Sequence, residues 1–499
     1  MSADLKSSLV NPAVSKPPLG THAPSVALPL GFVLSGLLSL GFGVGWLVLR
    51  PSLLATYHYN QYVIALTHLF VLGWISSVVM GAMYQLVPVA LETKLYSEKL
   101  ARVQFACHLV GFVGMVWMFR VWNMKQVGHF GCVLGLGVAL FVYNIARTLR
   151  RVPKWNVTAT AVAAALFWIG FTVTAGLCVA AGKCAYDSNT GFATEGGVPL
   201  VVDGLRALGA FMARFDAISA MHAHAHLGGV GFFTMLIVGV SYKLIPMFTL
   251  SELRSKTRAT ASIVLLNIGL AGSFTTILLR SPWKPAFALV VMTALGLYGW
   301  ELAAILNARK RRSLDWGIKY FLTAVVLLFP LSGLAVVLAW PGLPLNTFTG
   351  QLENVYGFLG LVGVVSLAIL GMLYKIIPFL VWFGRYSPHI GRAKVPALAD
   401  LYSTRLQAFG YWSFLAGLGV TCAATLVSSE AFVRMGAILL ALAVATLALN
   451  VGAMLTHLIK PRLEPLGAPS NPAKSTNRSE LTGAKTASPL SPSPISKPA

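Results

Sequence analysis

Four histidines are candidate ligands for a metal ion or a haem: His68, His222, His224 and His226. Each lies in a long apolar stretch, where an ionisable side chain is costly and is usually kept for a function. Neutral imidazole is a common ligand of haem iron and copper. On a helix His222 and His226 share one face, and His224 points roughly the opposite way. One face could therefore supply two ligands to one metal while His224 serves another site. The alternative is that the three histidines line a hydrated cavity or donate to backbone carbonyl groups.

The other six histidines lie in a tail, in loops, or in or near the ends of predicted helices: His22, His58, His108, His129, His389 and His457. We expect His108 and His129 to be hydrogen-bonded structural residues, and the remaining four to be solvated or interfacial.

The composition indicates the elements that must position these residues. Hydrophobic residues make up 56% of the 499 residues and charged residues 11%, whereas about 25% charged residues is usual in soluble proteins. A membrane-crossing helix needs about 20 apolar residues. Twelve segments meet this requirement: 28–49, 61–90, 101–120, 128–149, 158–182, 214–247, 258–280, 284–307, 317–341, 350–382, 404–427 and 431–458. The predicted fold is an all-α polytopic membrane protein.

Charge gives the predicted orientation. Lysine and arginine gather in the loops after the even-numbered segments, which places these loops and both termini in the cytoplasm of a bacterial-type inner membrane. Because topology accounts for the formal net charge of +23, nucleic acid is not an expected partner. Residues 1–27 and 461–499 are rich in serine and proline and are predicted to be disordered cytoplasmic tails. Residues 28–460 form the predicted membrane domain.

Three of the longest segments share an internal repeat, and their alignments start at His68, His226 and Phe358. Counted from these residues as position zero, all three carry leucine at +1, glycine at +5 and +13, tyrosine at +16 and proline at +20. The repeat divides twelve helices into three pseudo-symmetric units of four. We expect the glycines to allow close helix packing, the tyrosines to anchor at the interface, and the prolines to end the spans.

Three four-helix units, cytoplasmic termini and an early His68 resemble the haem–copper oxidase subunit I superfamily, most nearly its C-type and nitric-oxide-reductase branches, over residues 28–460. The chain is also broadly similar to nitric-oxide-response haem–copper membrane proteins. The resemblance implies that His68 binds a low-spin haem and that the run His222–His226 contains a copper ligand. Two expected ligand groups are missing, because 354–358 and 258–280 contain no histidine.

In the oxidases a haem bridges equivalent positions on the tenth and second helices. Here the equivalent positions of the second and sixth helices carry histidine, which suggests a b-type haem held by His68 and His226. His222 and His224 would then serve copper, a second haem or a propionate. Glu353 and Asn354 could accept hydrogen bonds or protons. Tyr356 occupies the repeat position of His224 and is either a hydrogen-bonding or redox residue or a packed aromatic.

These features favour a haem-binding, or haem- and copper-binding, membrane redox protein that transfers electrons or handles dioxygen or nitric oxide. Cytochrome or other oxidase-like subunits are the partners that the resemblance implies, beside the lipid bilayer. A non-catalytic haem or copper carrier, sensor or assembly factor is the alternative that the missing ligands favour. A small-solute transporter is a further alternative. Transporter repeats are often inverted, however, whereas the three repeats of this chain have the same orientation.

Overall fold

The computed structural model describes residues 25–186 and 199–465. In this part of the chain twelve helices are long and apolar enough to cross a membrane. The strands among the described residues are one short antiparallel pair, β1 (Ala393–Lys394) and β2 (Glu464–Pro465). The predicted all-α polytopic fold is therefore confirmed, and a chain of this kind requires a lipid bilayer.

Nine spans are single α-helices: α1 (Ala27–Leu49), α5 (Glu98–Arg120), α6 (Met124–Leu149), α7 (Val157–Tyr186), α11 (Lys256–Leu278), α12 (Lys284–Asn307), α13 (Trp316–Leu338), α16 (Thr404–Leu426) and α17 (Glu430–Ile459). Three spans change helix type on the way. They are span two (α3 Gln61–His68, η1 Leu69–Ser76, α4 Ser77–Ala90), span six (α9 Ala217–His226, η2 Leu227–Thr234, α10 Met235–Thr249) and span ten (α14 Thr347–Phe358, η3 Leu359–Ser366, α15 Leu367–Arg385). Shorter helices are α2 (Ser52–Ala55), α8 (Pro199–Met212), η4 (Ser387–His389) and η5 (Leu398–Leu401).

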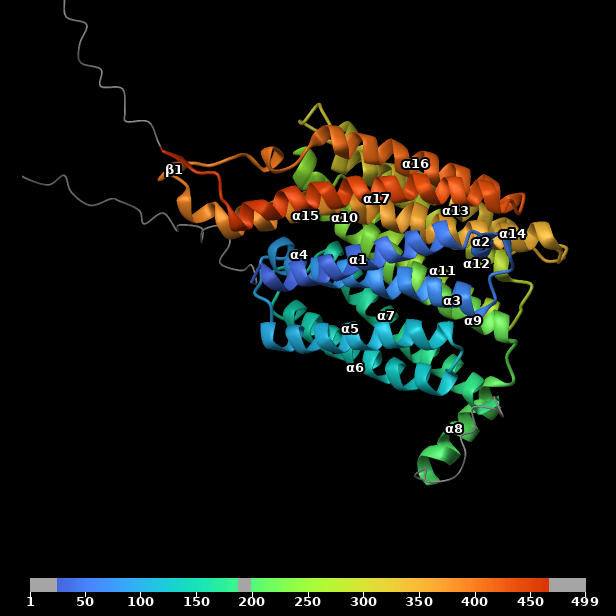
Figure 1. Ribbon diagram of the computed structural model, residues 1–499. Helices are drawn as coiled ribbons and strands as arrows, with labels where there is room; N and C mark the ends of the chain where they lie inside the picture. Colours follow the sequence, from blue (N-terminus) through green and yellow to red (C-terminus); the bar gives the residue numbers. More distant parts are fainter. Residues whose placement is uncertain (1–24, 187–198, 466–499) are drawn as a thin grey trace, which may run out of the picture.

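Spans two, six and ten form the centre of the bundle. Within their most apolar windows 61%, 72% and 83% of the residues are buried, against 28–44% in the other nine spans. The first span, α1, packs beside the last, α17, so the helices close into a ring (Figure 1). We call the end of the bundle that carries α2 and the starts of α9 and α14 the α2 end.

The threefold repeat extends beyond the central spans to the whole four-helix unit. Three serines, Ser97, Ser255 and Ser403, cap the third helix of each unit by accepting from a backbone N–H three residues on. The loop at each of these caps is held by a polar side chain of the fourth helix. The backbone N–H groups of Ser97, Ser255 and Ser403 donate to Asn144, Glu301 and Asn450 at 3.1, 2.8 and 2.9 Å. The repeated caps fix where each third helix begins.

The repeated glycines at +13 lie where each central span meets the first helix of its own unit. A Cβ at Gly81 would lie 2.5 Å from Phe32 Cβ on α1, and at Gly239 and Gly371 it would collide with Ala161 on α7 and with the Gly317 carbonyl on α13. These glycines therefore allow the close helix approach that small residues provide in membranes, as predicted.

The predicted interfacial role of the repeated tyrosines is wrong. Tyr84, Tyr242 and Tyr374 are at most 4% exposed, and their hydroxyl groups hydrogen-bond to Gln104, Ser262 and Asn450 at 2.7–3.2 Å. The prolines at +20 do not end the spans either. Each lies inside its helix, and α15 continues for seven residues after Pro378, to Arg385. Packing inside the bundle accounts for the buried tyrosines and for the helices that continue past the prolines. The repeat alone does not reveal this packing.

All three central spans contain a π-helical segment at one repeat position. The segments Leu69–Ser76, Leu227–Thr234 and Leu359–Ser366 run from +1 to +8. A hydroxyl near the end of each donates to a carbonyl five residues back: Ser77 to Leu72, Thr234 to Gly229 and Ser366 to Leu361, at 2.8–3.2 Å. π-Helical turns are rare and occur often at functional sites, and these begin directly after His68 and His226.

The predicted tails fall mostly outside the described residues, which begin at Ser25 and end at Pro465. Within the predicted C-terminal tail, Glu464 and Pro465 pair with Lys394 and Ala393 in the small sheet. The Lys394 ammonium group also forms a 2.8 Å ion pair with Glu464.

Candidate functional site

A cavity of about 560 Å³ opens inside the bundle toward the α2 end. Its walls come from the three central spans, two, six and ten, and from spans three to five, and they include His68, Phe119, Gly176, His224 and Tyr356. Cofactor sites typically have volumes of about 300–1,000 Å³ and apolar walls with a few polar groups. The cavity therefore has the size and lining of a cofactor site.

His68 presents one ring nitrogen as a free ligand atom. It is the last residue of α3, and its Nδ1 lies 2.8 Å from the Ile64 carbonyl oxygen one turn earlier. Because a carbonyl only accepts, Nδ1 carries the proton and Nε2 keeps its lone pair. A metal-binding histidine is usually oriented in this way through its other nitrogen. The Phe119 ring, 4.5 Å away between centroids, supports the imidazole from the side.

His224 is the second histidine of the cavity wall. Its Nδ1 is buried and has no hydrogen-bond partner among the described residues. The ring fits because Gly176 on α7 leaves space for it, and a Cβ at that position would lie 2.8 Å from His224 Cε1. His224 and His68 line the same cavity. Two imidazoles from different spans thus line one cavity, and each has a ring nitrogen available.

His226 has a different partner from the one predicted. Its Nδ1 donates to the His222 carbonyl at 2.7 Å, and its Nε2 accepts from the Tyr356 hydroxyl at 3.1 Å. The two rings stack at an angle of 22°. The His226 nitrogen that would bind a haem is therefore engaged by span ten, and the pairing of His68 with His226 has less support than the pairing of His68 with His224.

The repeat explains both contacts by one rule. Position zero of span six, His226, meets position −2 of span ten, Tyr356. Rotation by one unit places position zero of span two, His68, against position −2 of span six, His224. The presence of His68 and His224 on the wall of one cavity agrees with this relation.

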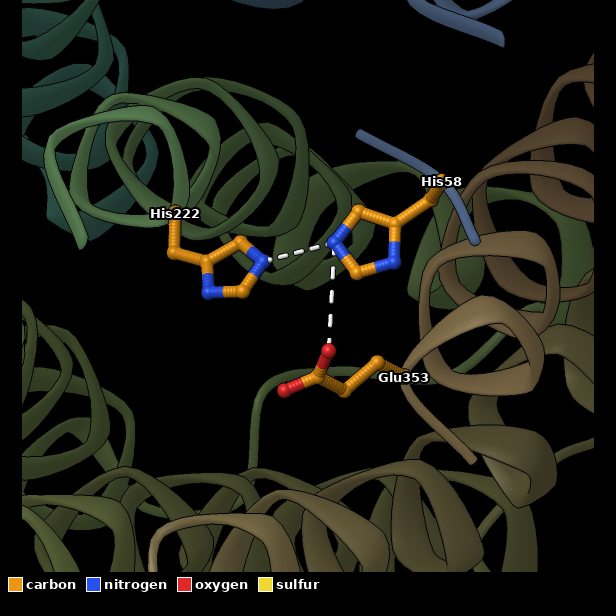
Figure 2. A group of neighbouring side chains, drawn as sticks. All are labelled: His58, His222 and Glu353. Carbon is orange, nitrogen blue, oxygen red and sulfur yellow. Dashed lines mark hydrogen bonds and ion pairs between the residues drawn. The ribbon is translucent and has the colours of Figure 1, made fainter. Parts of the chain in front are cut away.

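His222 joins a separate cluster at the α2 end (Figure 2). Its Nε2 lies 3.0 Å from His58 Nε2, and a Glu353 carboxylate oxygen lies 3.9 Å from the same His58 atom. Ligand atoms of the three residues are all within 4.8 Å of one another. His222 and His226 share a helix face, as predicted, but their free nitrogens point to different partners, so they do not bind one metal together.

His58 was predicted to be solvated or interfacial, and the structure shows it half-buried at the α2 end. Span ten holds the loop before it: Asn354 Nδ2 donates to the Thr56 carbonyl at 2.7 Å, and Gln351 Nε2 donates to the Ala55 carbonyl at 3.1 Å. Asn354 thus donates through its amide nitrogen, and the predicted acceptor role of its side chain stays a prediction. The side chain of His58 is 16% exposed, and burial lowers its pKa. No sequence pattern marks this loop residue, since only packing brings it back over the bundle.

The remaining histidines have structural roles or lie apart from the cavity. His108 is 1% exposed and contacts Ser77 Oγ at 2.9 Å, as expected for a structural residue. His129 is exposed, beside Gln126. His457 was predicted to be solvated or interfacial, but it is 3% exposed and its Nδ1 contacts the Tyr386 hydroxyl at 2.7 Å. His22 lies outside the described residues.

Comparison with known families agrees with this geometry. The family model described as Cytochrome C and Quinol oxidase polypeptide I matches residues 22–128. This match supports membership of the haem–copper oxidase subunit I superfamily. Over these residues the match agrees with the resemblance drawn from the sequence. The matched residues include His68 and end before span six. None of the curated proteins compared matches the chain.

A haem fits the residues that this oxidase-like chain presents, because His68 and His224 offer free nitrogens in an apolar cavity. Lys183 and Lys284 also line the cavity and could neutralise acidic groups of such a ligand. The copper site of the superfamily does not fit, because α11 carries no histidine. His222, the predicted copper ligand of span six, instead contacts His58.

Proposed function

We propose that this oxidase-like chain is a b-type haem protein of a bacterial-type inner membrane that transfers electrons. The observation that carries the proposal is the pair His68 and His224, two histidines with free ring nitrogens in one apolar cavity. A bound haem would supply one-electron redox chemistry. The chain's own residues would hold it, exclude water and set its electrostatic surroundings.

His68 and His224 would hold the haem together, and a haem held by two histidines would supply electron transfer in preference to dioxygen or nitric oxide chemistry. The Ile64 carbonyl fixes the His68 tautomer, and Gly176 leaves room for the His224 ring. The missing histidines of α11 and of residues 354–358 are consistent with the loss of the second, gas-binding centre. We also propose that the chain exchanges electrons with a cytochrome-type partner. Both of its termini would lie in the cytoplasm.

The test is a reduced-minus-oxidised optical spectrum of the full chain, purified in detergent after expression with haem supplied. We expect a low-spin b-type band that carbon monoxide does not shift, and its loss in His68→Ala. His129→Ala, which alters an exposed histidine, serves as the control and should keep the band. A colourless wild-type protein, or a band that survives in His68→Ala, would contradict the proposal.

A haem carrier or assembly factor is the second candidate, favoured by the absence of the superfamily's other ligands from α11 and from 354–358. The two functions differ in how firmly haem is held. An electron-transfer protein keeps its haem when mixed with excess apomyoglobin, whereas a carrier releases it. Release within minutes would favour the carrier.

A further inference from the structure

The cluster of His58, His222 and Glu353 lies at the α2 end of the cavity that also contains His68 and His224, and the proposed haem site does not use these three side chains. It is built from three separate elements: the loop after α2, the helix α9 and the helix α14 (Figure 2). Both imidazole Nε2 atoms and a carboxylate oxygen converge on one point, within 4.8 Å of one another. His58 and His222 are 164 positions apart in the chain, and His222 and Glu353 are 131 apart. Their meeting is therefore a tertiary contact and not part of a local helix cap or turn.

Direct contacts among the three residues satisfy them poorly. The two Nε2 atoms are 3.0 Å apart, so one of them must carry a proton to bond to the other. The carboxylate oxygen, 3.9 Å from His58 Nε2, is beyond hydrogen-bond distance. His58 Nδ1 is buried without a hydrogen-bond partner. An ion that accepted both Nε2 lone pairs would remove the conflict between the two imidazoles.

The surroundings suit a bound ion. With an ion on Nε2 the His58 proton moves to Nδ1, beside the Asn354 side chain. The Asn354 amide nitrogen already donates to the Thr56 carbonyl and Gln351 Oε1, at 2.7 Å each, so its oxygen is the atom available to accept from Nδ1. Such hydrogen bonds orient metal-binding histidines. Two carboxylates, Glu353 and Asp216, lie near the imidazoles, and two cations oppose them: Lys284 near His222 and Glu353, and Arg280 near Asp216.

We infer that His58, His222 and Glu353 bind one divalent transition-metal ion at the α2 end of the bundle. Two imidazole nitrogens and one carboxylate oxygen are a donor set for borderline ions such as Zn²⁺ and Cu²⁺, with at least one position left for water. Affinity for such a set is highest with Cu²⁺. This inference does not depend on haem binding at His68 and His224.

The experiment titrates Cu²⁺, and separately Zn²⁺, into the chelator-stripped full chain in detergent, with affinity measured by chelator competition. We expect one ion per chain and a Cu²⁺ electron paramagnetic resonance spectrum that shows two coupled nitrogen nuclei. His58→Gln, His222→Gln and Glu353→Gln should each weaken binding at least about 10-fold, the smaller cost known for loss of a group that orients a metal ligand. Lys284→Met should strengthen it.

The control His129→Gln, at an exposed histidine, should leave the affinity unchanged. Size-exclusion behaviour and the optical spectrum of each variant show whether it still folds. Binding that is equal in wild type and in a His58→Gln/His222→Gln double variant would overturn the site, and so would an equal loss in His129→Gln. Copper binding in a chain without haem would contradict the proposed function alone, and haem without copper would contradict this inference alone.

Discussion

Two interfaces of the central spans use the same repeat positions for different chemistry. Between spans two and six, His68 and His224 line a cavity of about 560 Å³, and each has a free nitrogen. Between spans six and ten, His226 and Tyr356 line the same cavity but hydrogen-bond directly to each other at 3.1 Å, and both also line a smaller cavity of about 90 Å³. One substitution at position −2, tyrosine for histidine, thus accompanies the change from an open ligand pair to a closed polar contact.

The third interface, between spans ten and two, carries Phe358 at position zero and Leu66 at position −2. Both side chains are buried and apolar. The three interfaces therefore form a series from two histidines through histidine and tyrosine to no polar group. The backbone is shared, since each central span has its π-helical segment at the same place. We therefore expect the side chains at positions zero and −2 to decide which interface binds a cofactor.

The largest effect is expected when the interface of spans two and six receives the side chains of the interface of spans six and ten. His224→Tyr places a phenol opposite His68, where it can donate to Nε2 as Tyr356 donates to His226. We expect loss of the low-spin haem band, measured by the reduced-minus-oxidised spectrum. An unchanged band would show that His224 is not a ligand.

A smaller effect is expected from filling the space beside His224. In Gly176→Ala the added Cβ would lie 2.8 Å from His224 Cε1, so the ring must move. We expect haem affinity to fall on the order of 10-fold, as for loss of other groups that orient ligands, measured by haem titration. The matched control is Gly170→Ala on the same helix, where an added Cβ meets no atom within 4 Å. Equal behaviour of the two variants would count against the role of Gly176.

The smallest effect is expected at the second interface. Tyr356→Phe removes the donor to His226 Nε2 and should lower the free energy of unfolding by about 1 kcal/mol, the usual scale of a hydrogen bond inside a membrane protein. Denaturant unfolding in detergent measures the change. The haem spectrum should stay the same, and loss of haem in this variant would show that the two interfaces are not separate.

Much of the fold could be predicted because it depends on local properties of the sequence. Runs of apolar residues predict the spans; the tenth, for example, was predicted as 350–382 and is found as Thr347–Arg385. The repeat predicts the units and the close approach at Gly239. The π-helical segments could not be predicted, because hydrogen bonding five residues apart depends on how the central spans pack together.

The residues of the candidate site could be predicted, since His68, His222, His224 and His226 all line the cavity. The pairing of His68 with His226 stays a prediction, and the contact of His226 Nε2 with Tyr356 favours His224 in its place. That contact could not be predicted, because it depends on how spans six and ten pack together. His58 was missed because its place depends on hydrogen bonds from Asn354 and Gln351, more than 290 residues away in the chain.

The central claim is that position zero of span two and position −2 of span six hold one haem. The most direct measurement is the low-spin band of His224→Ala compared with that of His226→Ala, two substitutions one half-turn apart on the same helix. The band should be lost in His224→Ala and retained in His226→Ala. Loss in His226→Ala with retention in His224→Ala would contradict the account and restore the pairing of His68 with His226.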